Sequence, residues 1–237
     1  MSLKVLKFGG SSVGSAEAMH RAAAIVREEL PEGGLVVVSA LRGTTDAILE
    51  ACQAASRGDE GAALSIHRDL RERHLAVAQD LDLLAPLGEV WHPLFERLEQ
   101  LLTGMAMLRQ ATPRGRDAAL AVGETLSAQL AATAFQATFR DVRELMKTDD
   151  RFGKARPLLQ DLRNAAGPWR EALASGQRWV TQGFLGATQE GATTTLGRGG
   201  SDTSATLLGE ALGAEEVQIW TDVDGVLTDY PSLVPEA

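Results

Sequence analysis

Short apolar runs alternate with helical patterns near the start of the chain. Residues 3–8 form one apolar run, and the β-branched run 35–38 forms a second, of the kind that is buried on both faces of a parallel sheet. Between the two runs, apolar residues recur at helical spacing from Met19 to Leu30, and Pro31 ends the pattern. Strand, helix and strand in this order predict a βαβ unit, whose crossover is almost always right-handed.

The middle of the chain, from about residue 45 to residue 110, has an almost entirely helical pattern. One face repeats at alternating spacings of three and four residues: Trp91, Leu94, Leu98, Leu101, Met105 and Leu108. Such a stripe can recognise a partner helix, but a strongly periodic face more often marks packing within its own domain. We therefore predict a helical insertion that packs on itself.

The second half of the chain returns to alternating elements. We predict a helix over 123–137, a strand over 142–147, a helix from Pro157 to Gly176, a strand over 178–182, a helix capped by Ser201 or Asp202 that ends at Gly213, and a strand over 217–221. These elements predict an α/β fold: a three-layer αβα sandwich with a mainly parallel central sheet and a helical insertion.

Composition narrows the classes of function. The 237 residues are 44% hydrophobic and carry a formal net charge of -9, which argues against nucleic acid or an acidic membrane as a partner. No apolar run reaches membrane-spanning length. Cys52 is the single cysteine, so an internal disulfide is impossible and a reducing compartment is expected. We expect a cytoplasmic protein.

Two glycine-rich loops carry the most informative residues. The first is the segment Lys7-Phe8-Gly9-Gly10-Ser11-Ser12-Val13, and the second runs from Thr194 to Asp202 around Arg198. Each follows a β-like run and precedes a helical pattern. The glycines let the backbone approach a ligand closely, and the N-terminus of the following helix then points its free N–H groups at an anion. Two such loops, each with a cation, predict a site for two negatively charged substrates.

Each loop also has a simpler interpretation. Lys7 alone could be a solvent-exposed lysine at the end of a strand, and its loop is neither a Walker A loop nor a dinucleotide fingerprint. Arg198 is either a solvated loop residue or a clamp that binds a carboxylate in bidentate fashion. Asp202 could simply cap its helix, a role compatible with a second one in the site.

Other candidate groups favour structural roles. His20, His67, His74 and His92 lie in polar helical contexts and are expected at the surface, so we predict neither a metal cluster nor a histidine base. Asp222 and Asp224 follow a strand; they are too few for a calcium loop, and a turn is the stronger interpretation.

Taken together, the motifs resemble those of the amino acid kinase superfamily, and within it the aspartate kinases. The first loop matches the family pattern Lys-Phe-Gly-Gly-Thr/Ser-Ser-Val. The other matching segments follow in order: Val38-Ser39-Ala40 with Gly43-Thr44-Thr45, Gly123-Glu124 with Leu126-Ser127, residues 148–153, Gln182-Gly183-Phe184, residues 193–202 and residues 220–225. The resemblance spans nearly the whole chain.

This resemblance implies transfer of the ATP γ-phosphoryl group to the side-chain carboxylate of L-aspartate, the first step of lysine, threonine and methionine biosynthesis. It implies that Lys7 and Asp202 are catalytic, with magnesium entering together with ATP. The implied aspartate-binding residues are Thr45, Glu124, Phe184, Arg198, Gly199, Gly200 and Ser201. The implied nucleotide-binding residues are Lys7, Gly9, Gly10, Ser11, Thr221 and Asp222.

The sequence departs from the family pattern after Gly225, where Leu227, Tyr230 and Ser232 replace the usual aromatic, Asp and Arg. The resemblance implies that residues 1–237 form a catalytic domain that is incomplete at its C-terminal end, with no ACT regulatory domain, and that the full-length protein is a homo-oligomer. Two alternatives stay open: another kinase of the superfamily, or a non-catalytic module for aspartate binding or subunit interaction.

Overall fold

The computed structural model describes residues 3–221 of the chain, and a five-stranded sheet lies at its centre. The strand order is β3-β4-β2-β1-β7, and every neighbouring pair is parallel. The strands are β1 (Lys4–Phe8), β2 (Gly34–Val38), β3 (Thr138–Phe139), β4 (Arg178–Gln182) and β7 (Glu216–Trp220). The predicted strands near residues 3–8, 35–38, 178–182 and 217–221 are therefore confirmed.

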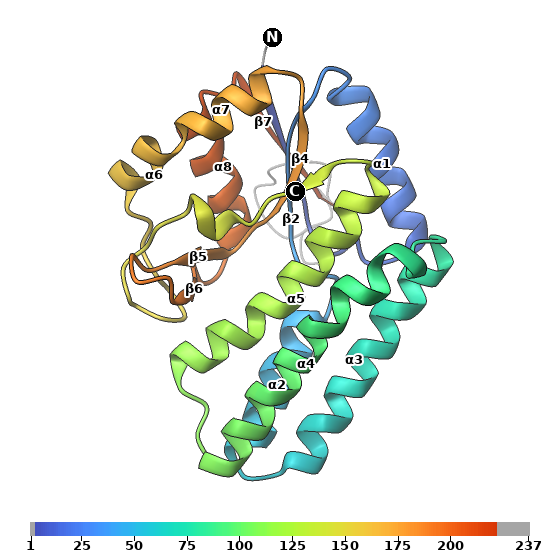
Figure 1. The fold of residues 1–237 in the computed structure, drawn as a ribbon, viewed down its shortest axis with the longest axis vertical. Helices are drawn as coiled ribbons and strands as arrows, with labels where there is room; N and C mark the ends of the chain where they lie inside the picture. The colour runs from blue at the N-terminus through green and yellow to red at the C-terminus, as the bar shows by residue number, and fades with distance from the viewer. Residues whose placement is uncertain (1–2, 222–237) are drawn as a thin grey trace, which may run out of the picture.

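Helices cover both faces of this sheet, so the predicted three-layer αβα architecture is confirmed. Alternate strand residues point to opposite faces: Leu6 and Val36 belong to one apolar core, and Val5 and Leu35 belong to the other. Figure 1 shows α1 on one side of the sheet and α6, α7 and α8 on the other. α5 packs on the same side as α1. The bounds of the covering helices are α1 (Ala16–Glu29), α5 (Pro113–Ala134), α6 (Leu159–Ala165), α7 (Gly167–Ala174) and α8 (Gly200–Leu212).

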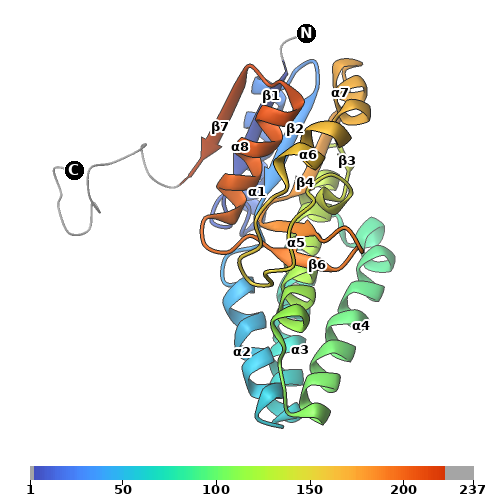
Figure 2. The same ribbon diagram turned by 90° about the vertical axis from the view of Figure 1, so that its left-hand side faces the viewer.

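The predicted helical insertion forms a separate lobe below the sheet (Figures 1 and 2). We call α2 (Thr44–Ser56), α3 (Glu60–Asp80) and α4 (Leu84–Leu108) the helical lobe. The α4 stripe packs within the lobe as predicted, because Trp91, Leu98 and Met105 are buried; Leu108 at its end is exposed. α5 runs from this lobe up to the sheet and so connects the two parts (Figure 1).

The prediction that the histidines lie at the surface is wrong for two of them. His67 and His74 on α3 are buried against Trp91 and Phe95 of α4. Burial lowers the pKa of His74 to about 4, so this imidazole is a neutral part of the lobe core near pH 7. A polar sequence context did not reveal that both rings fall on the inward face of a long helix.

Several predicted bounds in the second half are also wrong. α5 begins at Pro113, ten residues before the predicted start, and residues 142–147 contain the 3-10 helix Val142–Glu144 in place of a strand. The helix expected between Pro157 and Gly176 is divided into α6 and α7. A short antiparallel pair, β5 (Leu185–Ala187) and β6 (Thr193–Thr195), was not predicted at all. Within residues 3–221, no helix is both long and apolar enough to cross a membrane.

Candidate active site

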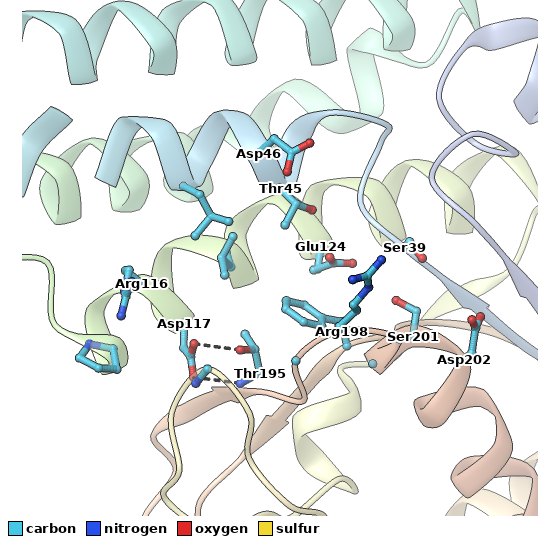
Figure 3. A pocket seen from close by; sticks show the side chains of 18 of the residues that line it. Ser39, Thr45, Asp46, Arg116, Asp117, Glu124, Thr195, Arg198, Ser201 and Asp202 are labelled. Atoms are coloured by element: carbon cyan, nitrogen blue, oxygen red, sulfur yellow. Dashed lines mark hydrogen bonds between the residues drawn. The ribbon is translucent and has the colours of Figure 1, made fainter. Parts of the chain in front are cut away.

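A cavity of about 720 Å³ lies where the helical lobe meets the carboxyl edge of the sheet. Its wall is formed by parts of β1, α2, α5, β6 and the start of α8, together with Ser39, which directly follows β2. Figure 3 shows several of these side chains converging from different elements. The lining includes all seven residues expected to bind aspartate, together with Lys7 and Asp202: Thr45, Glu124, Phe184, Arg198, Gly199, Gly200 and Ser201.

Lys7 and Asp202 form an ion pair at this cavity. Lys7 lies in the buried strand β1, and its Nζ is 2.6 Å from Oδ1 of Asp202 in the first turn of α8. A carboxylate is favourable at a helix N-terminus. The ammonium side chain is only 10% exposed whereas the carboxylate is 51% exposed, so the pair holds a nearly buried cation at the edge of the open space.

Arg198 projects from a loop whose shape depends on glycine. Gly197 and Gly199 on either side of it have φ values of 79° and 72°, a left-handed conformation that costs glycine little. α8 begins at Gly200, and neither Ser201 nor Asp202 caps it, because the N-cap is Gly199 with no side-chain hydrogen bond. The cap prediction is therefore wrong. The Gly200 N–H donates to the Gly197 carbonyl at 2.9 Å, whereas no capping side chain occupies the N–H groups of Ser201 and Asp202, which can face an anion.

Phe184 is held tightly against the same helix. It adopts a φ of 66°, unusual for a residue with a side chain. Its backbone N–H donates to Oγ of Ser204 at 3.0 Å, and a Cβ on Gly200 would lie 2.7 Å from the Phe184 ring. The ring and the start of α8 thus form one rigid wall of the cavity.

Glu124 forms the opposite side of the cavity from within α5. It is 4% exposed, and its Oε2 accepts a hydrogen bond from the N–H of Ala40 at 2.7 Å. Burial raises the pKa of Glu124 to about 8, although the Ala40 hydrogen bond and the charge of Lys7 oppose the rise. A cationic group entering the cavity would favour the ionised form of this carboxyl.

Asp117 is a cavity residue that the sequence interpretation missed. It is buried in α5, and its carboxylate accepts hydrogen bonds from the N–H of Gly153 and from the N–H and hydroxyl of Thr195 (Figure 3). The predicted helix began at Gly123 and so excluded it. Thr112 followed by Pro113 is a good start signal for a helix, and it could have placed Asp117 on the same helix as Glu124.

The residues expected to bind the nucleotide are less closely gathered. Ser11 and Thr221 line a second cavity of about 230 Å³ beside α1, whereas Lys7 lines the larger one. Gly9 and Gly10 link Lys7 to Ser11, and a Cβ on Gly10 would lie 2.6 Å from the Ala40 carbonyl oxygen. Asp222, Leu227, Tyr230 and Ser232 lie outside the described residues. Within 3–221, no cluster of three or more His, Cys, Asp or Glu side chains could hold a metal.

Comparison with known proteins gives consistent matches over the whole chain. The model of the amino acid kinase family matches residues 2–237. The aspartokinase of Chlamydia trachomatis serovar D is 38% identical over 98% of this chain and 51% of its own length. Lysine-sensitive aspartokinase 3 of Escherichia coli is 36% identical, with 98% and 52% covered. The chain spans about half the length of these relatives.

Solved structures give the same result for the fold. Escherichia coli aspartokinase III in complex with aspartate and ADP superposes with a TM-score of 0.90 at 36% identity, over 99% of this chain and 52% of that one. The same enzyme in complex with lysine and aspartate gives a TM-score of 0.87 at 35% identity, over 98% and 52%. With its sequence motifs, its three-layer architecture and these matches in agreement, the chain belongs to the amino acid kinase family.

Proposed function

We propose that this chain carries the catalytic site of an aspartate kinase, which transfers the γ-phosphoryl group of ATP to the side-chain carboxylate of L-aspartate. The observation that carries the proposal is the shared cavity of Lys7, Glu124 and Arg198. Two cations and one buried carboxyl there match the charges of an amino acid beside a phosphate. The proposal is supported by the relative from Escherichia coli, whose structure contains aspartate and ADP.

Each aspartate group has a suitable partner in the cavity. Arg198 would bind the α-carboxylate through its planar guanidinium, which can make two parallel hydrogen bonds. Glu124 would receive the α-ammonium group, whose charge favours the ionised carboxylate. Thr45 and Ser201 would position the side chain with their hydroxyl groups, and Phe184, Gly199 and Gly200 would border the pocket.

The chemical step requires no base. A carboxyl group with a pKa of about 3.9 is already ionised at neutral pH, so its oxygen can attack the γ-phosphorus directly. The new O–P bond forms as the bond from phosphorus to the bridging oxygen breaks, giving 4-phospho-L-aspartate and ADP. Lys7, oriented by Asp202, would stabilise the charge on the transferring group. Alignment of the two anions in the site would supply the remaining rate acceleration.

Magnesium would be held mainly by the nucleotide phosphates. Mg²⁺ in phosphoryl-transfer sites keeps several waters and needs only one or two carboxylates besides the phosphates. Among the described residues, Asp202 is half-exposed at the cavity beside Lys7, so its carboxylate could share in holding the ion. Bound in this way, the ion would neutralise charge on the phosphate oxygens.

A hydroxamate assay with Mg-ATP and aspartate tests the proposal, because hydroxylamine traps the acyl phosphate. At high Mg-ATP concentration we expect slow formation of product with aspartate and none with glutamate. Lys7→Ala should lower kcat at least about a hundredfold while the fold is kept. Normal turnover in this variant would contradict the role of Lys7. Aspartate binding without any hydroxamate would favour a non-catalytic module, and a preference for glutamate would favour another kinase of the family.

A further inference from the structure

We propose that Asp117 is a positioning residue, which sets the distance between the Arg198 loop and the opposite wall of the cavity. The inference rests on the proposed function, since it assigns Asp117 a part in aspartate binding. Asp117 itself is expected to contact no substrate. It acts through Thr195 and Gly153, the two residues that donate hydrogen bonds to its carboxylate.

The contacts of Asp117 use both carboxylate oxygens. Oδ2 accepts from the N–H of Gly153 at 2.8 Å and from the N–H of Thr195 at 3.0 Å. Oδ1 accepts from the hydroxyl of Thr195 at 2.9 Å. A buried carboxylate that accepts three hydrogen bonds is held in one orientation, and it holds its two partners in turn.

Both partners lie at the base of the Arg198 loop. Thr195 ends β6 three residues before Arg198, and its carbonyl accepts a hydrogen bond from the N–H of Ala155 at 2.8 Å. Gly197 packs against the other partner, since a Cβ there would lie 3.2 Å from the carbonyl oxygen of Gly153. The base of the loop is therefore fixed to α5 through Asp117, while Arg198 itself stays exposed.

The same helix also holds the opposite wall. Asp117 and Glu124 are seven residues apart in α5, so they share one face and stand about 10 Å apart along the axis. Glu124 binds the N–H of Ala40 just after β2, next to the segment with Ser39 and Thr45. One rigid helix thus fixes the spacing between the wall with Arg198 and the wall with Thr45.

This arrangement predicts a substrate-selective defect when Asp117 is lost. Asp117→Ala releases Thr195 and Gly153 from α5 but leaves Lys7, β1 and the first glycine loop untouched. Aspartate bridges the two walls in the proposed site, so its affinity should fall. The phosphates of ATP would contact the side of the site formed by Lys7, and their affinity should change little.

The test measures dissociation constants for aspartate and for a non-hydrolysable ATP analogue by titration calorimetry on the intact protein. We expect Asp117→Ala to weaken aspartate binding at least tenfold and analogue binding less than twofold. Asp117→Asn should restore most of the affinity, because its carbonyl can accept both N–H groups while its amide donates to the Thr195 hydroxyl.

Asp149→Ala is the matched control. Asp149 accepts hydrogen bonds from the N–H groups of Arg151 and Arg156 in the same connecting segment, so its loss disturbs that segment without releasing β6. Its aspartate affinity should stay within twofold of the parent value. Thr195→Val replaces the hydroxyl by a methyl group and so removes its hydrogen bond to Asp117. It should weaken aspartate binding two- to fivefold and serves as the main test if Asp117→Ala does not fold.

The possible results separate the two proposals. The positioning role is overturned if Asp117→Ala binds aspartate as tightly as the parent protein; Thr195→Val replaces it in this test if Asp117→Ala does not fold. It is also overturned if Asp117→Ala loses affinity equally for aspartate and the ATP analogue. An equal loss of aspartate affinity in Asp149→Ala would overturn it as well. In each of these cases aspartate binding by the parent protein still supports the proposed function. If the parent protein does not bind aspartate, the proposed function and the positioning role both fail.

Discussion

Glu124 and Asp202 are carboxylic residues on the same cavity, but their surroundings differ. Asp202 is half-exposed and paired with the Lys7 ammonium. Glu124 is buried, and a single backbone N–H from Ala40 is the hydrogen-bond donor found for it among the described residues. Burial thus leaves Glu124 with a raised pKa and a strong preference for a cationic partner.

This raised pKa predicts that Glu124 makes stability depend on pH. The folded protein keeps a proton on Glu124 up to about pH 8, whereas the unfolded chain releases it near 4.5. The free energy of unfolding should therefore fall as pH rises through this window, by on the order of a few kcal/mol. Glu124→Gln should lack this component in urea denaturation at several pH values. Parallel curves for the parent and the variant would show that Glu124 titrates normally.

Arg198→Lys should separate charge from geometry at the carboxylate clamp. Lysine keeps the positive charge but lacks the planar fork that makes two parallel hydrogen bonds. We expect KM for aspartate to rise roughly tenfold, which corresponds to the lower end of the about 1.5–3 kcal/mol of a hydrogen bond to a charged group, and KM for ATP to stay nearly constant. Steady-state kinetics with each substrate varied in turn measures both. Equal rises would mean that Arg198 does not bind the α-carboxylate.

At the scale of elements, the loops after β1 and β2 pack directly on each other. The N–H of Arg42 donates to the carbonyl of Gly10 at 3.1 Å, and Gly10 leaves no room for a side chain beside Ala40. Gly9 differs, because the nearest atom to an added Cβ is Nζ of Lys7 at 3.6 Å. Packing therefore requires glycine at position 10 but leaves room for a Cβ at position 9.

Substitution by alanine should lower the stability at position 10 but leave it nearly unchanged at position 9. Gly10→Ala must push the backbone of one loop away from the other and should cost about 1–3 kcal/mol, as overpacking does. Gly9→Ala should leave the free energy of unfolding within about 0.5 kcal/mol, as for most substitutions without a steric conflict. Urea denaturation of both variants checks this. Similar stabilities for the pair would contradict the packing at Gly10.

The sequence predicted elements with a strong local signal and missed those that depend on tertiary contacts. The apolar run of β2 and the periodic face of α4 have such signals, and both elements were predicted correctly. β5 and β6 have three residues each and form a two-stranded sheet of their own, so they are too short for a periodic pattern to mark them. Val142, Leu145 and Met146 in the predicted strand 142–147 are buried, yet they lie in a 3-10 turn and its continuation, whose shape depends on the surrounding structure.

The same distinction applies to the site. Lys7, Glu124, Arg198 and Asp202 were found because they lie in motifs, and the structure brings them to one cavity. Asp117 belongs to no predicted motif, and its importance depends on contacts with Gly153 and Thr195, which are distant in sequence. Likewise, nothing local to Glu124 indicated that its carboxyl would be fully buried.

For the molecule as a whole, the two halves of the proposed site differ in how completely residues 1–237 form them. All seven aspartate-binding candidates share the larger cavity, whereas the nucleotide-binding candidates Ser11 and Thr221 line a smaller one. Three family side chains after Gly225 are also replaced. We predict measurable aspartate affinity but weak Mg-ATP binding and low kinase activity for a polypeptide of residues 1–237. Titration calorimetry with both ligands checks this, and tight binding of an ATP analogue would contradict it.

The strand order also determines when the fold can be completed. β2 pairs with β4 across the whole helical lobe, and Lys4 in β1 pairs with Glu216 near the end of the described chain. Sheets built from such distant segments form slowly because a long loop must close first. The helical lobe, by contrast, is one continuous stretch whose helices pack on each other.

During synthesis, the apolar strands β1 and β2 can pair with each other but lack their outer neighbours. β2 waits for β4, and β1 waits for β7, until residues 178–220 have been made. Such edges invite association between unfinished chains. Pulsed hydrogen exchange during refolding should show amides of α3 and α4 protected before those of β1 and β4, and refolding yield should fall as protein concentration rises. The fold that brings Lys7 and Asp202, distant in sequence, to one cavity thus makes its own assembly depend on β7, the last of the described strands to be synthesised.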